Sequence, residues 1–111
     1  MANPCLQPRL SDFRGYPFGT DLVAQGGLVY AAGHTIPAGG NLTPLTKSMS
    51  GALMTDSVET TWGPSGGGTI PNGFEVIAYV SLNNQITYTL CNTSSSPIVT
   101  ISTSVYFRVY R

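Results

Sequence analysis

Two apolar runs joined by a pair of asparagines place the strongest constraint on the fold of this chain. Residues 74–81, Phe-Glu-Val-Ile-Ala-Tyr-Val-Ser, are largely apolar on both faces, which is typical of a central strand. Residues 85–91 alternate, with apolar side chains at every second position. Asn83 and Asn84 between the runs can take left-handed conformations and so close a tight reversal. The stretch therefore predicts a β-hairpin.

Other stretches show the same two-residue period or are bounded by turn residues. They predict further strands at residues 28–32, after a Gly26-Gly27 turn, and at 41–50, 57–62 and 99–111. Residues 51–56 are ambiguous and could form one helical turn. No helix of normal length is indicated. We therefore expect an all-β fold, a small antiparallel β-sandwich (jelly-roll or Ig-like) of about six to seven strands in residues 21–111.

The last predicted strand separates two kinds of side chain. We expect the first face to lie in the core; it carries Val99, Ile101, Val105, Phe107 and Val109. The opposite face carries Tyr106, Arg108 and Tyr110 at every second position. Tyr and Arg are enriched where proteins bind partners, so this row is a candidate contact surface. The alternative is that it packs against a second sheet of the same domain.

Residues 1–20 precede the predicted domain and contain three prolines but no period. A disordered tail is one interpretation. We favour an extended N-terminal arm that contacts a partner or its own domain, because the segment also carries aromatic and basic side chains. The candidate contact residues are Arg9, Phe13, Arg14, Tyr16 and Phe18.

Charge is scarce: only 9% of residues are charged, against about 25% in ordinary soluble domains, and the net charge is zero. We expect a surface largely covered in an assembly, with a weakly charged monomer as the alternative. The five basic residues are scattered, which argues against nucleic-acid binding. No apolar run is long enough for a membrane helix.

The beginning of the chain lacks the features of a secretory signal, so we expect a compartment where disulfides are uncommon. The two cysteines, Cys5 and Cys91, are accordingly expected to be free thiols, although a bridge between them is an alternative.

Nothing in the sequence indicates catalysis. The single histidine, His34, has no nucleophile in a Gly-x-Ser-x-Gly turn to act with. One histidine and two distant cysteines do not supply closely spaced metal ligands. The glycine-rich loop at 63–68 lacks the lysine of a phosphate-binding loop. We expect a protein that is not an enzyme and uses no cofactor or metal.

A short motif occurs twice, as Thr-Ile-Pro-Ala-Gly at 35–39 and Thr-Ile-Pro-Asn-Gly at 69–73. The two copies are too short to indicate a duplicated fold, and we interpret them as one kind of turn used twice.

Four stretches of the chain carry a resemblance to a known family. They are Thr-Ile-Pro-Ala-Gly-Gly-Asn-Leu-Thr-Pro-Leu-Thr at 35–46, which contains the first copy, Ser-Gly-Ala-Leu at 50–53 with Asp56, and the stretches at 69–81 and 86–98. Together they resemble a small all-β module of tailed-bacteriophage virion proteins. Such modules occur in capsid decoration (cement) proteins and in tail fibres. The resemblance covers about residues 28–111 and implies a virion structural role, with no catalytic residue carried over.

The short chain with its arm favours a decoration protein within that class. We expect it on the capsid surface of a virion assembled in the host cytoplasm, clamping the major capsid protein as a homo-oligomer, a dimer or trimer. The alternative is a tail-fibre or host-surface glycan-binding module, for which Trp62 and Tyr79 are the candidate aromatic residues.

Overall fold

Eight strands follow one another in the computed structural model, which describes residues 21–111 and has no helix in that range. They are β1 (Leu22–Tyr30), β2 (Thr35–Ile36), β3 (Leu45–Ser48), β4 (Ser57–Pro64), β5 (Phe74–Leu82), β6 (Gln85–Asn92), β7 (Ile98–Val99) and β8 (Thr103–Tyr110).

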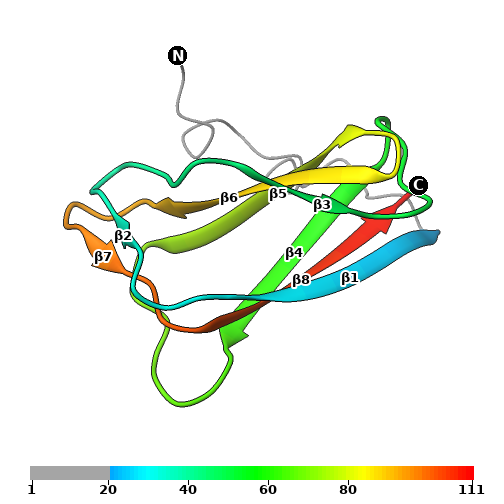
Figure 1. Ribbon diagram of the computed structural model, residues 1–111. Coiled ribbons are helices and arrows are strands. Elements are labelled where there is room, and N and C mark those ends of the chain that lie inside the picture. The colour runs from blue at the N-terminus through cyan, green and yellow to red at the C-terminus, as the bar shows by residue number, and fades with distance from the viewer. Residues whose placement is uncertain (1–20) are drawn as a thin grey trace.

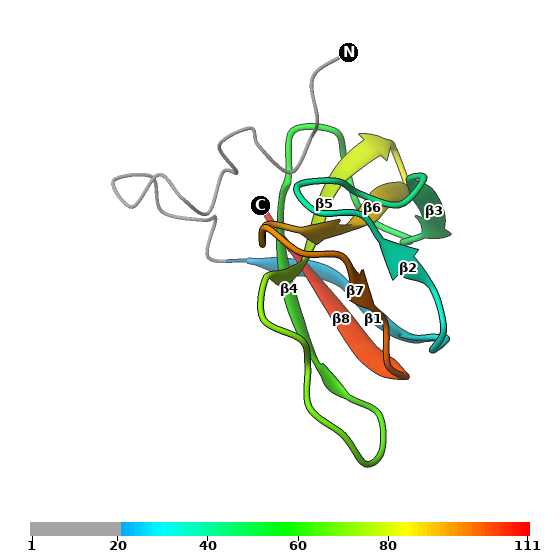
Figure 2. The ribbon, with the colours of Figure 1, turned by 90° about the vertical axis from the view of Figure 1, so that its left-hand side faces the viewer.

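The strands form two facing antiparallel layers (Figures 1 and 2). One sheet has the order β1-β8-β4 and the other has the order β3-β6-β5. A two-stranded sheet, β2-β7, lies at one end of the pair. All the pairings are antiparallel. The prediction of a small all-β sandwich is confirmed.

Alternation along the central strands builds the core between the layers. On β8, Val105, Phe107 and Val109 are each at most 1% exposed, because every second side chain faces the other sheet. Phe107 meets Tyr88 of β6 across the layers, with ring centroids 5.3 Å apart. This burial raises the pKa of the Tyr88 phenol, since the charged form would lose its hydration.

The sandwich is closed on one side by contacts between β4 and β5. The Trp62 ring of β4 lies edge-on to the Phe74 ring of β5, with centroids 6.2 Å apart. The Thr60 hydroxyl donates a hydrogen bond of 2.9 Å to the Val76 carbonyl. These edge strands therefore cover one another.

The predicted hairpin is confirmed. Strands β5 and β6 pair from Phe74↔Asn92 to Leu82↔Gln85, with a register shift between Val80 and Leu82. Asn84 has a φ of 67°, the left-handed conformation that asparagine tolerates in a tight reversal.

The predicted single strand at 99–111 is wrong as one element. It is divided into β7 and β8, and Val99, expected in the core, is 55% exposed. The division lies at Thr100, which is 3% exposed. Its hydroxyl accepts a hydrogen bond from the His34 N–H and donates one to the Ala31 carbonyl. The Thr100 backbone is also paired, since its N–H donates to the His34 carbonyl (2.8 Å) and its carbonyl accepts the Gly33 N–H (2.9 Å). Backbone and hydroxyl together hold the chain to residues 31–34 where it passes from one sheet to another.

Strand β1 begins six residues earlier than predicted, and Gly26-Gly27 is not a turn. Both glycines lie inside the strand, opposite Phe107 and Tyr106 of β8. Glycine within a strand often marks a close approach by another group, and that is its role here.

Strand β3 is shorter than the predicted strand at 41–50. It begins at Leu45, directly after Pro44, which has no N–H for a ladder. Upstream, the Leu42 N–H donates to the Leu90 carbonyl (3.0 Å) and the Thr89 hydroxyl donates to the Leu42 carbonyl (2.7 Å), so a backbone bond and a side chain together hold this segment against β6.

The two Thr-Ile-Pro segments do form the same kind of turn. In the first, the Gly40 N–H donates to the Pro37 carbonyl and Gly39 has a φ of 65°. In the second, the Phe74 N–H donates to the Pro71 carbonyl and Gly73 has a φ of 88°.

Asn92, which is 1% exposed, connects these two turns. Its side-chain amide donates to the Ile36 carbonyl (3.1 Å) and the Ser96 carbonyl (2.7 Å), and its Oδ1 accepts from the Ser94 N–H (2.9 Å). The Asn92 backbone N–H donates to the Gly40 carbonyl at 2.9 Å. The next N–H, that of Thr93, donates to the carbonyl of the second turn at Gly73. One buried amide therefore joins β2, the end of β6 and the loop before β7.

Cys91, beside Asn92, is fully buried and disulfide-bonded. The expectation of free thiols is thus wrong for Cys91. Cys5, the only other cysteine in the sequence, lies outside the described residues.

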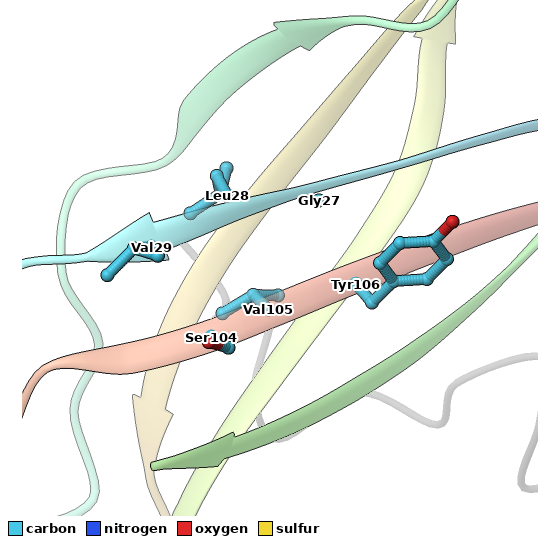
Figure 3. A pocket seen from close by; sticks show the side chains of 6 residues that line it. All are labelled: Gly27, Leu28, Val29, Ser104, Val105 and Tyr106. Atoms are coloured by element: carbon cyan, nitrogen blue, oxygen red, sulfur yellow. The ribbon is translucent and has the colours of Figure 1, made fainter. Parts of the chain in front are cut away.

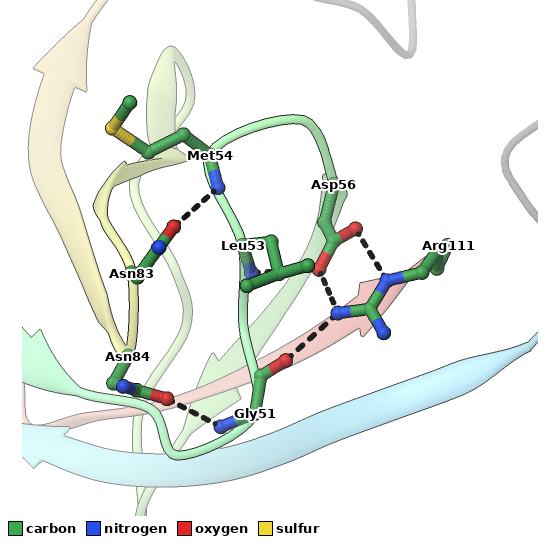
Figure 4. A network of polar contacts seen from close by, with 7 residues as sticks. All are labelled: Gly51, Leu53, Met54, Asp56, Asn83, Asn84 and Arg111. Atoms are coloured by element: carbon green, nitrogen blue, oxygen red, sulfur yellow. Dashed lines mark hydrogen bonds and ion pairs between the residues drawn. The ribbon is translucent and has the colours of Figure 1, made fainter.

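Residues 51–56 form hydrogen-bonded turns that are tied to the last residue of the chain (Figure 4). Arg111 donates from Nε and Nη2 to the Asp56 carboxylate, both at 3.1 Å, and from Nη2 to the Gly51 carbonyl at 3.0 Å. The same carboxylate accepts the Leu53 N–H at 2.8 Å. The Asp56 side chain is only 1% exposed, so this network fixes the turn against the end of β8.

Replacing Asn92 by alanine should lower the free energy of unfolding by about 3 kcal/mol, because buried backbone groups lose their partners. Urea unfolding measures the change. Asn72→Ala, at an exposed position in the second turn, is the control and should change stability by less than about 0.5 kcal/mol. Equal effects of the two substitutions would contradict the role given to the Asn92 amide.

Asp56→Asn should lower the free energy of unfolding at pH 7 by about 1 kcal/mol, since Arg111 is half exposed and the pair is partly screened. The hydrogen bonds from Arg111 hold the pKa of Asp56 below its usual value, against the opposing effect of burial. A lowered folded-state pKa stabilises the fold above about pH 4, and that stabilisation is lost as the pH falls through the folded pKa.

Urea unfolding of both proteins at pH 7 and at about pH 2 tests this. The difference between them should shrink at low pH, whereas an equal difference at both values would show that the carboxylate charge contributes nothing.

Candidate functional site

The predicted contact row lies on the outer face of the β1-β8-β4 sheet. Tyr106, Arg108 and Tyr110 alternate along β8 with the buried Val105, Phe107 and Val109. The alternative that this row packs against a second sheet of the same domain is therefore wrong, because the opposite face of β8 does so. Tyr106 is 38% exposed.

Tyr106 is positioned by the glycine opposite it on β1. Gly27 pairs with Tyr106, and a Cβ atom at Gly27 would lie 2.8 Å from Tyr106 Cδ2 and 3.0 Å from the Val105 carbonyl oxygen. The first distance is shorter than real Cβ contacts, and the second is tighter than most of them, so a side chain at position 27 would have to displace the ring. The ring therefore occupies the space that a residue other than glycine would fill.

Arg108 lies between an aromatic ring and a carboxylate. Its guanidinium carbon is 5.3 Å from the centroid of the Tyr106 ring, a cation–π contact. Its Nη1 is 3.4 Å from Glu59 Oε1 on the paired strand β4. Both charged side chains are about 40% exposed, so the ion pair adds little to stability. Its effect is to orient the guanidinium over the sheet.

An open hollow of about 320 Å³ lies beside this row, between β1 and β8 (Figure 3). Its lining consists of Gly27, Leu28, Val29, Ser104, Val105 and Tyr106. None of these is a carboxylate, imidazole, thiol or amine. The hollow is suited to an apolar group of a partner, bordered by the Tyr106 ring and by Val29, which is 60% exposed.

The sequence prediction missed Gly27 and Glu59 as parts of this site. Gly27 was predicted to form a turn together with Gly26. A glycine inside an otherwise regular strand often marks a close approach by another group, and that pattern could have identified Gly27 as part of the site. The other predicted contact residues, Arg9, Phe13, Arg14, Tyr16 and Phe18, lie outside the described residues.

The two aromatic residues considered for glycan binding do not form one site. Trp62 is partly buried and packs with Phe74 against the core. Tyr79 is 59% exposed on β5, in the other sheet.

In residues 21–111, no group of three or more histidine, cysteine or acidic side chains is arranged to hold a metal ion. The same part of the chain has no helix that could cross a membrane. The chain matches no protein family, no curated protein and no solved structure.

Gly27→Ala should lower the free energy of unfolding by about 2 kcal/mol, because the added methyl group displaces the Tyr106 ring and meets backbone. Thermal or urea unfolding measures this. Gly66→Ala is the control, since a Cβ there has no neighbour within 4 Å, and it should change stability little. Adding Tyr106→Ala to Gly27→Ala should recover part of the loss. No recovery would show that the ring is not what excludes a side chain at position 27.

Proposed function

We propose that this protein is a non-enzymatic virion structural protein, a decoration or cement protein that binds the surface of a bacteriophage capsid. The observation that carries the proposal is the outer face of β8, where Tyr106 is held half exposed by Gly27 and Arg108. A rigid, partly exposed tyrosine beside an oriented arginine is the arrangement that binding hot spots favour. The resemblance of residues 28–111 to virion modules supplies the class of partner.

The proposed partner is the major capsid protein, and the described surface suits a large, mostly neutral contact. The outer face of the β1-β8-β4 sheet presents exposed apolar and aromatic groups with one internally balanced ion pair, Arg108–Glu59. Removing an unpaired charge from water is the costly part of burying charged groups. Binding at this face would bury few such charges. Contact across two neighbouring capsid subunits would add buried area at their seam and so strengthen the shell against internal DNA pressure.

Co-sedimentation with capsids of the corresponding phage that lack this protein tests the proposal. Wild-type protein should bind, and Tyr106→Ala should weaken binding by about 30-fold, the size of a hot-spot loss. Tyr79→Ala removes an equally aromatic but more exposed side chain from the other sheet and should leave binding unchanged. Equal losses for the two variants would contradict docking through the outer face of β8.

Host cells lacking phage provide the second arm of the experiment. Binding to cells together with no binding to capsids would overturn the decoration proposal in favour of the glycan-binding alternative. Replacing Phe13, Tyr16 and Phe18 together by alanine tests the N-terminal arm. Unchanged capsid affinity would remove the arm from the contact.

A further inference from the structure

Strand β1 differs from the other edge strands of the two larger sheets. It pairs only with β8, so one side of its backbone has no described strand beside it. It is nine residues long and contains neither a charged residue nor proline. It also exposes two large apolar side chains, Leu22 at 47% and Val29 at 60%. Folded proteins rarely leave such an edge open, because it can pair with another chain.

The other edges carry the protection that β1 lacks. Strand β3 has only four residues and includes Lys47. Strand β4 includes Glu59 and ends at Pro64, and strand β5 includes Glu75. The Thr60–Val76 hydrogen bond also holds β4 and β5 against one another. On β1, the register shift between Leu22 and Ala24 lies near the beginning of the strand, and residues 25–30 have no charged residue, proline or register shift of their own.

The open part of β1 is the stretch 25–30. Near the beginning of the strand, a Cβ at Gly51 would lie 2.8 Å from the Val23 carbonyl oxygen, so the turn at 51 covers that end. Further along, the ends of Lys47 and Met49 lie close to Gly26, on the face of β1 that Gly26 shares with the buried Phe107 opposite it. In the described part of the chain, no backbone group outside β8 bonds to the backbone of residues 25–30.

We propose that two copies of this chain pair through β1, antiparallel and around a two-fold axis at Gly27. The two β1-β8-β4 sheets would then become one six-stranded sheet. This inference stands independently of capsid binding, because it concerns the strand edge and not the outer face.

The composition of β1 favours a second copy as its occupant. A strand that pairs with itself around a two-fold axis must not place like charges opposite each other, and β1 has no charge to oppose. Gly27 would lie opposite Gly27 of the second copy, so no side chains collide at the axis. Gln25 would lie opposite Val29, and Gly26 opposite Leu28, which pairs a small residue with a large one. The proline-rich residues 1–20 are a poorer occupant, because each proline lacks a ladder donor.

The register gives a test by charge exchange at two outward positions, Gln25 and Val29, both exposed. Q25K/V29K places two lysines opposite two lysines across the axis and should weaken the dimer about tenfold or more. Q25E/V29K carries substitutions at the same positions, but each glutamate of one copy then lies opposite a lysine of the other. This variant should restore dimerisation. Sedimentation equilibrium of the purified full chain measures both.

Several results would overturn the proposal. The first is a wild-type chain that remains monomeric up to about 1 mM. The second is a Q25K/V29K variant that dimerises as well as the wild type. The third is a Q25E/V29K variant that dimerises as weakly as Q25K/V29K. The matched control is A38K/S95K, which adds two lysines at exposed positions in loops away from β1 and should dimerise normally.

Amide hydrogen exchange separates edge pairing from contact through the sheet face. Pairing predicts that amides in residues 25–30 exchange more slowly as protein concentration rises, at alternate residues, because only every second N–H of β1 points away from β8. A dimer with no concentration-dependent protection in this stretch would assign the interface elsewhere and overturn the proposal.

Discussion

The arrangement of this sandwich depends most on the hydrogen bonds made by the side-chain amide of Asn92. It lies where β6 ends and both Thr-Ile-Pro turns converge, and its hydrogen bonds leave its own polar atoms and the facing carbonyls satisfied. Without it, the buried carbonyl of Ile36 would lose this side-chain partner. Such a cluster is stable only when it is complete. The hydrogen bonds of this one buried side chain therefore determine where the small β2-β7 sheet lies against the larger layers.

Much of the fold and part of the site could be predicted because both follow from a two-residue period. Alternation along β8 identified Tyr106, Arg108 and Tyr110 as sharing one face and Phe107 as lying in the core. The same period failed at Thr100, because the alternation in the sequence continues through a break between two strands. There the backbone and the hydroxyl of Thr100 bond to residues 31–34. The period also failed at Gly27, because a glycine pair is usual in turns and its close contact with Tyr106 joins residues 79 positions apart. Such contacts are properties of the folded chain.

The outer face and the edge proposed for self-pairing belong to the same sheet, and Gly27 contributes to both. On the outer face it makes room for the Tyr106 ring, and at the edge it would meet itself without a side chain. Pairing of two copies would place their Tyr106 and Arg108 rows on one continuous surface. The two rows would lie about three strand spacings apart, or roughly 14 Å. A symmetric target such as the contact between two capsid subunits could then be held by both rows at once, which raises effective affinity without a new contact.

The two ends of the described chain are joined to each other, since Asp21 and Arg111 exchange backbone hydrogen bonds of 3.4 and 2.9 Å. Antiparallel β1 and β8 thus begin and end side by side (Figure 1). A mechanical load applied between these two ends would open the pair like a zipper, breaking one bond after another. A load along the strands would have to shear the whole ladder simultaneously. The domain is consequently weak against pulling at its ends and strong against sliding within its sheet.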